Sequence, residues 1–174
     1  MAQQTDTGIN PAEGPVIFSR SFDAPRELVF KAWTEADRLM QWWGPKGFTM
    51  RAAKVDLRPG GVFHYAMTGP NDMEMWGKFV YREIDTPRRL SFVTSFSDAE
   101  GGTVRAPMSG TWPLEVLSTL TFTEQDGKTT ITGQAMAINV NDEEQQAFDQ
   151  GITSLQAGFK GTLDQLDAYL AEVA

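Results

Sequence analysis

The sequence predicts an α+β domain in which a curved, mostly antiparallel sheet packs against one long C-terminal helix. From Thr49 to about Ala137, apolar and polar residues alternate between short turn sequences, which is typical of antiparallel strands. After Asn141, large apolar residues recur three or four positions apart, which is typical of an amphipathic helix. Because one long apolar stripe must be buried against one sheet face, we expect the helix to cover one side of the sheet.

The N-terminal region is expected to form a strand and two short helices. Val16–Phe22 is rich in β-branched and aromatic residues, which predicts the first strand. Pro25 suits the first turn of a helix, and apolar residues from Leu28 to Trp33 follow at helical spacing. A second short helix is expected at Glu35–Gln41.

Turn sequences divide the alternating region into six further strands, which gives about seven strands in all. We expect these strands at Met50–Leu57, Val62–Thr68, Glu74–Ile84, Arg88–Ser95, Val116–Glu124 and Lys128–Ile138. Most of the links between them are short, so neighbouring strands are expected to be antiparallel. The glycine- and proline-rich segment Ser97–Pro113 is too long for a hairpin turn, and we expect a surface excursion or a lid there.

The C-terminal helix has a clear start. Asn141 is a good N-cap, and acidic residues follow it in the first turn. The apolar stripe comprises Phe148, Ile152, Leu155, Phe159, Leu163, Leu166 and Leu170. Gly151, Gly158 and Gly161 each cost about 1 kcal/mol relative to alanine inside a helix, so we expect a close approach or a space for a ligand beside them.

Length and composition favour a single domain. The 174 residues suit one domain at residues 15–174, preceded by a polar, flexible tail at residues 1–14. The tail has neither the basic nor the apolar region of a signal peptide, and no apolar stretch is long enough to span a bilayer. A cytoplasmic protein is therefore expected.

Charge and cysteine content exclude several classes of function. The formal net charge of -8 opposes binding to nucleic acid or to anionic membranes, since both attract basic surfaces. The chain has no cysteine, which removes disulfides, thiolate metal sites and cysteine nucleophiles. Gly60-Gly61 is not followed by the residues of a phosphate-binding loop, and no dinucleotide motif is present, so no cofactor is expected. One histidine without cysteine cannot build a histidine-rich zinc site, so no metal is expected either.

The order of elements resembles the helix-grip fold of the START and pollen-allergen-like domains. More specifically, five stretches are similar to the family named for the activator of Hsp90 ATPase. They are Ser21–Thr34 (SFDAPRELVFKAWT), Trp42–Pro45 (WWGP), Val55–Gly61 (VDLRPGG), Trp112–Val116 (WPLEV) and Gly158-Phe159 followed by Leu163–Leu166 (LDQL). Many members of that family carry tryptophan at the position of Phe159, which still provides a large apolar anchor. The resemblance implies an interior space that START-like relatives use for lipids, hormones and polyketides.

Alternation predicts which side chains face the helix. In Val62–Thr68, Phe63, Tyr65 and Met67 share one face, and we expect this bulky set to point inward. The candidate ligand-binding residues are Phe48, Phe63, Tyr65, Met67, Trp76, Phe92, Thr94, Met136, Phe159 and Leu163. Two interpretations remain open: the set packs a solid core, or its rings and thioethers line a cavity for an apolar ligand. Polar groups such as Tyr65, Thr94 or Arg51 would then orient the ligand.

Three further features have structural and functional interpretations. Trp42, Trp43 and Phe48 lie in or beside an aromatic loop, where they either plug one end of the core or form the rim of a ligand mouth. His64, the only histidine, falls on the face opposite Phe63, so we expect a surface or turn-supporting role and no catalytic one. Asp56 and Arg58 are expected to brace the tight turn at Gly60-Gly61.

The sequence favours a non-catalytic binding module for a hydrophobic or aromatic small molecule. One alternative is a regulator of an Hsp90-type chaperone, as the resemblance implies. The other is a cyclase or hydrolase acting on a polyketide-like substrate, which would need acid–base residues inside the cavity. An exposed sheet edge or the segment Ser97–Pro113 offers a surface for a homodimer.

Overall fold

The structure, a computed structural model, describes residues 10–107 and 109–174. In this part of the chain the strands are β1 (Val16–Phe22), β2 (Thr49–Val55), β3 (Val62–Thr68), β4 (Glu74–Asp85), β5 (Arg89–Ser97), β6 (Thr103–Val104), β7 (Glu115–Gln125) and β8 (Lys128–Ile138). The α-helices are α1 (Arg26–Thr34), α2 (Ala36–Trp42) and α3 (Asp142–Val173), and two 3-10 helices are η1 (Pro11–Glu13) and η2 (Pro70–Asp72).

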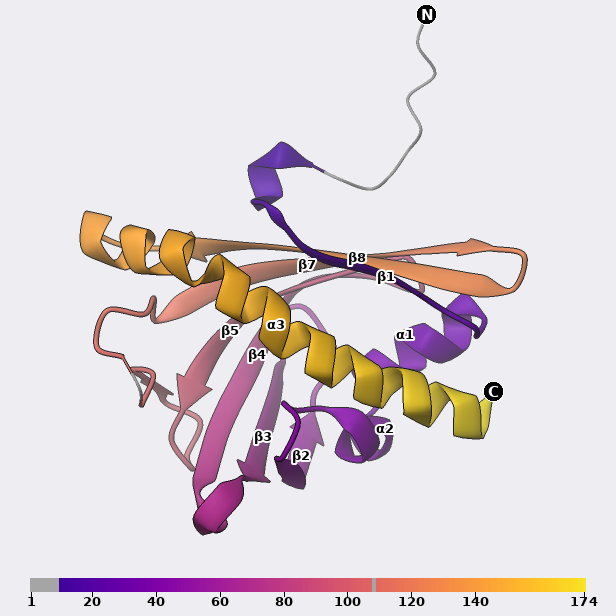
Figure 1. The fold of residues 1–174 in the computed structure, drawn as a ribbon, viewed down its shortest axis with the longest axis horizontal. Coiled ribbons are helices and arrows are strands. Elements are labelled where there is room, and N and C mark those ends of the chain that lie inside the picture. Colours follow the sequence, from indigo (N-terminus) through magenta and orange to yellow (C-terminus); the bar gives the residue numbers. More distant parts are fainter. Residues whose placement is uncertain (1–9, 108) are drawn as a thin grey trace, which may run out of the picture.

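The strands form one antiparallel sheet in the order β1-β8-β7-β5-β4-β3-β2, and β6 pairs with β5. Figure 1 shows α3 running across one face of this sheet, with α1 and α2 beside its C-terminal half. The predicted fold class, an α+β helix-grip arrangement of a curved antiparallel sheet around a long C-terminal helix, is confirmed. β1 and β2 are the outer strands of the sheet, and a homodimer through either edge stays a prediction.

Most element bounds agree closely with the sequence pattern. β1, β3 and β8 have the predicted bounds, and the other long strands differ from prediction by one or two residues at one or both ends. Pro25 directly precedes α1 as its N-cap and has an extended backbone. The pattern missed β6, because a two-residue strand is too short to show alternation.

α3 begins with a complete capping box. The side chain of Asn141 accepts a hydrogen bond from the backbone N–H of Glu144 at 2.8 Å, and the Glu144 carboxylate accepts one from the backbone N–H of Asn141 at 3.1 Å. Of the three α3 glycines, Gly151 is closely packed, because a Cβ there would lie 2.7 Å from the Trp112 ring. A Cβ at Gly158 would meet open space, so no packing reason for that glycine is found.

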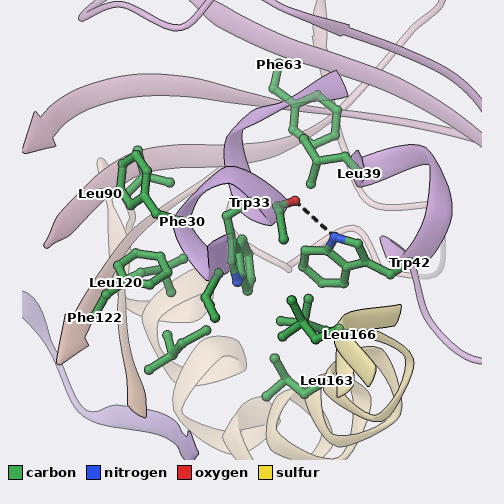
Figure 2. Packing of buried hydrophobic residues seen from close by; sticks show 14 of the residues in the cluster. Phe30, Trp33, Leu39, Trp42, Phe63, Leu90, Leu120, Phe122, Leu163 and Leu166 are labelled. Atoms are coloured by element: carbon green, nitrogen blue, oxygen red, sulfur yellow. Dashed lines mark hydrogen bonds between the residues drawn. The ribbon is translucent and has the colours of Figure 1, made fainter. Parts of the chain in front are cut away.

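The principal core lies where α1, α2 and the C-terminal half of α3 meet the concave face of the sheet. Figure 2 shows Trp33 and Trp42 between Phe63 on the sheet side and Leu163 and Leu166 from α3. The indole N–H of Trp42 donates to the carbonyl oxygen of Ala32 at 3.0 Å, so this ring fills the core without leaving a polar group unpaired.

The segment before β1 covers the outer face of β8. The side-chain amide of Gln134 donates to the carbonyl oxygens of Asn10 and Gly14, at 2.8 and 3.0 Å. Glu13 forms an ion pair with Arg89. Residues 10–14, which the sequence assigns to a flexible tail, therefore contact the sheet, whereas residues 1–9 of that tail lie outside the described residues.

Candidate ligand-binding cavity

A cavity of about 660 Å³ lies between the concave face of the sheet and the N-terminal half of α3. Its walls come from α1, the loop after α2, six strands, the segment before β7, and α3. The lining residues include Ile17, Phe18, Trp33, Trp43, Tyr65, Phe79, Phe92, Thr94, Trp112, Val116, Ser118, Leu120, Gly133, Ala135, Ala147, Gln150, Gly151, Ser154, Leu155 and Phe159. None of the described lining residues carries a charge.

Small side chains on facing elements create the space. Ser118 and Ala135 are paired neighbours on β7 and β8, and both point toward α3. On the helix, Ala147 and Gly151 line the same cavity. Large side chains at these positions would close the gap between sheet and helix, so the cavity follows from the residue sizes along these three elements.

Aromatic rings form the inner end of the cavity. Trp43 makes edge contacts with Trp33, Tyr65 and Phe79, at ring-centroid distances of 5.6, 6.0 and 5.2 Å. Phe79 stacks on Phe92 at 4.1 Å. Such edge and stacked contacts hold the rings in fixed orientations, so this end of the cavity has a defined shape.

Glycine determines where the Tyr65 ring lies. Gly77 is directly opposite Tyr65 in the β3–β4 pairing, and a Cβ at Gly77 would lie 2.4 Å from the Tyr65 hydroxyl oxygen. The ring therefore folds over β4 at Gly77, where no side chain blocks it. Burial raises the pKa of Tyr65 to about 12, against a smaller opposing effect of the Trp43 indole N–H, so the hydroxyl stays protonated at neutral pH.

The other end of the cavity opens toward solvent beside α3. Gln150 and Ser154 line it and are exposed. Trp112, from the segment predicted as an excursion or lid, contacts Phe148 with ring centroids 5.6 Å apart and borders the opening. Burial therefore increases from this mouth toward Trp33 and Phe79, which are each 1% exposed.

An ion pair fixes the segment beside the mouth to the start of α3. Arg105 donates to the Glu144 carboxylate at 2.5 Å and to the carbonyl oxygen of Trp112 at 3.2 Å. The hydrogen bond from Arg105, together with that from the Asn141 backbone, holds the pKa of Glu144 below its usual value. The carboxylate therefore stays charged and paired at neutral pH.

Four of the ten predicted site residues line the cavity, namely Tyr65, Phe92, Thr94 and Phe159. Phe63, Met67 and Leu163 point inward as expected, but they are buried in the principal core and do not line the cavity. Their role as ligand contacts has no support from their position.

Phe48, Trp76 and Met136 lie away from the cavity. Phe48 packs against Gly69, where a Cβ would come within 2.5 Å of its ring. Trp76 stacks on His64 on the outer face of the sheet, because β3 and β4 pair without a bulge and alternation from Phe79 then turns Trp76 outward. Met136 also points outward, and it lies beside Gly14.

Sequence reasoning missed several residues of the wall. Phe18 points inward from β1 and contacts Phe159 with ring centroids 5.1 Å apart, and alternation along β1 could have identified it. Trp43, for which the sequence allows a plug or a rim position, lies at the inner end of the cavity. Trp33 shows only helical spacing in the sequence, so no local signal distinguishes its cavity position from the core.

The remaining polar candidates have structural surroundings. The His64 Nε2 lies 3.1 Å from the Asp98 carbonyl oxygen and 3.2 Å from the Ser97 hydroxyl, outside the cavity. Arg58 donates to the Asp56 carboxylate at 2.8 Å beside the Gly60-Gly61 turn. The predicted orienting group Arg51 pairs instead with Glu74, at 2.9 Å, and does not line the cavity.

Two kinds of feature are absent from the described residues. Within residues 10–107 and 109–174, no three or more histidine, aspartate or glutamate side chains cluster as metal ligands. None of the helices in this part of the chain has the length and apolar composition needed to cross a membrane.

Solved structures with the same fold come from several bacteria. A protein from Mycobacterium smegmatis is 29% identical, with a TM-score of 0.67 and coverage of 87% of each chain. A protein from Staphylococcus epidermidis is also 29% identical, with a TM-score of 0.69, and the match covers 90% of this chain and 89% of the other. A protein from Arthrobacter aurescens is 26% identical, with a TM-score of 0.71 and coverage of 88% and 84%.

Comparison of the sequence with known proteins and with family models identifies the family. Among curated proteins, none matches the chain. The sequence model described as activator of Hsp90 ATPase homolog 1-like protein matches residues 23–171, which is most of the chain. Together with the helix-grip architecture, this match shows that the chain belongs to the activator of Hsp90 ATPase homolog 1-like family.

Proposed function

We propose that the protein binds a hydrophobic or aromatic small molecule in the cavity between the sheet and α3, without catalysing a reaction. The observation that carries this proposal is the cavity of about 660 Å³. Its size is within the range of small-molecule sites, about 300–1,000 Å³, and its walls are mainly aromatic and aliphatic with a few polar groups. Burial of the apolar surface of a ligand against these walls would provide most of the binding free energy.

The position of the cavity also supports binding. One end opens beside exposed residues of α3, and the other end is enclosed by rings that fix one another. A ligand could therefore enter without unfolding of the principal core. A preformed site of this kind requires little ordering of the protein when the ligand binds, which favours affinity.

A cavity-filling variant with a matched control tests the proposal. Ser118→Phe places a ring into the cavity from β7, and a benzene-sized ring needs only about 150 Å³. Leu117→Phe places the same ring on the outer face of the same strand. A panel of neutral polycyclic aromatic probes is titrated against both variants and the unchanged protein, with affinity from fluorescence and stabilisation from the shift in melting temperature.

At least one probe is expected to bind the unchanged protein and to raise its melting temperature. Ser118→Phe should weaken the binding of that probe at least about tenfold, whereas Leu117→Phe should leave its affinity unchanged. Near-UV circular dichroism checks that both variants are folded. The proposal is wrong if no probe binds the unchanged protein, or if Ser118→Phe binds as tightly as Leu117→Phe.

Family membership favours a second candidate, regulation of an Hsp90-type chaperone, because the family description names an activator of its ATPase. The test is the ATPase rate of purified Hsp90 with and without an excess of this protein. An increase that Ser118→Phe does not affect would support this role independently of the cavity. A cyclase or hydrolase has less support, since the described cavity wall offers no carboxylate, imidazole or amine.

A further inference from the structure

Two tryptophans at the inner end of the cavity carry buried N–H groups without a well-formed hydrogen bond. The Nε1 atoms of Trp33 and Trp43 are buried, and neither makes a hydrogen bond of normal geometry to the described residues. Burial raises the pKa of Tyr65, and the Trp43 N–H is near enough to the Tyr65 hydroxyl to lower that pKa slightly, but the two groups are not aligned as a hydrogen bond. Both indoles line the cavity. Trp42, which does not line it, donates its N–H to the Ala32 carbonyl oxygen (Figure 2). Unpaired buried donors are uncommon, so two beside one cavity call for a functional explanation.

The Tyr65 hydroxyl adds a third polar group to the same end. The Tyr65 ring lies against Trp43, with ring centroids 6.0 Å apart, and its position is fixed by Gly77. Because the phenol stays protonated, it can donate a hydrogen bond as well as accept one. This end of the cavity is therefore rich in donors, while the rings around it are apolar.

The charge of the ligand can be inferred from the wall. No lysine, arginine, histidine, aspartate or glutamate is present among the described lining residues. A charged ligand buried there would lose its hydration without gaining a counter-charge, which is strongly unfavourable. A pure hydrocarbon would leave the indole donors unpaired.

We propose that the ligand is an uncharged aromatic or polycyclic molecule with an accepting oxygen, such as a ketone or quinone carbonyl, held at the inner end by Trp33, Trp43 and Tyr65. This inference rests on the proposed function and specifies its ligand class. The carbonyl oxygen accepts hydrogen bonds from the indole and phenol groups, and the ring system fills the space between Phe92 and Phe159. The ligand is bound unchanged, and no bond is made or broken.

The test compares two probes of nearly the same shape, fluorenone with a carbonyl group and fluorene without one. Trp43→Phe and Tyr65→Phe each remove a donor, and Phe159→Leu alters the wall without removing one. Each donor variant is expected to weaken fluorenone binding about tenfold more than fluorene binding, because only fluorenone loses a hydrogen bond. Phe159→Leu should weaken both probes equally. Comparing ratios between variants cancels the different water solubilities of the probes.

A second measurement does not depend on variants. The infrared stretching band of the fluorenone carbonyl, bound to the unchanged protein, should lie at lower frequency than in an aprotic apolar solvent. If both probes bind but lose affinity equally in the donor variants, or the carbonyl band is unshifted, the inference is wrong and the proposed function stands. If neither these probes nor the wider panel bind, the proposed function fails as well.

Discussion

The contact between Gly77 and Tyr65 gives the most direct test of how the cavity is built. In Gly77→Ala, the new Cβ would lie 2.4 Å from the Tyr65 hydroxyl oxygen and 2.5 Å from Cζ. Ordinary contact begins at 3.4 Å, so the ring must move by about 1 Å. Phe63 and Trp43 already contact this ring, at 4.8 and 6.0 Å between centroids, and they restrict where it can go.

Overpacking of this kind typically destabilises a protein by about 1–3 kcal/mol, which outweighs the ~0.5–1 kcal/mol that alanine gains over glycine within a strand. We therefore expect Gly77→Ala to lower the free energy of unfolding. Tyr65→Val removes the ring atoms in the clash, so adding Gly77→Ala to that variant should be neutral or stabilising. The two substitutions should be coupled by at least about 1 kcal/mol.

Urea unfolding of the unchanged protein, the two single variants and the double variant measures this coupling. The reasoning is refuted if Gly77→Ala has the same effect on the free energy of unfolding with and without the Tyr65 ring. A refutation would mean that Gly77 does not determine where the ring lies.

Two further predictions concern α3. Gly158→Ala should stabilise the protein by about 1 kcal/mol, because nothing lies within 4 Å of its Cβ, whereas Gly151→Ala should lose that gain through a 2.7 Å contact with the Trp112 ring. Equal stabilisation of both variants in urea unfolding would contradict the Trp112 contact. Since Arg105 lowers the pKa of Glu144 in the folded protein, the pair stabilises the fold at neutral pH, and this contribution disappears as the pH falls through the depressed pKa. Glu144→Gln removes the charge but retains an oxygen for the capping box. This variant should be less stable than the unchanged protein at neutral pH and equally stable in acid. If the difference between their unfolding free energies did not depend on pH, the ion pair would not be its cause.

The elements of the fold could be predicted because their signals are local. Strand alternation, turn residues and the Asn141 cap each act over a few residues, so the bounds of β3, β8 and the start of α3 follow from the sequence. The inward direction of Tyr65, Phe92 and Thr94 follows from the same alternation. The aromatic inner end of the cavity was only partly predicted, since Trp33 and Trp43 follow the helical and loop patterns of ordinary core residues.

Tertiary structure decided what alternation leaves open. Alternation groups side chains on two faces, but the register of β4 beside β3 turns Phe79 inward and Trp76 outward. The segment around Gly14 then covers Met136 on the outer face of β8. Whether inward side chains fill the interior depends on the distance between the curved sheet and α3, which residues from many strands set together. The sequence alone therefore determined the strands, the helices and the family resemblance, whereas the cavity and its unpaired indole donors arise only when those distant segments pack together.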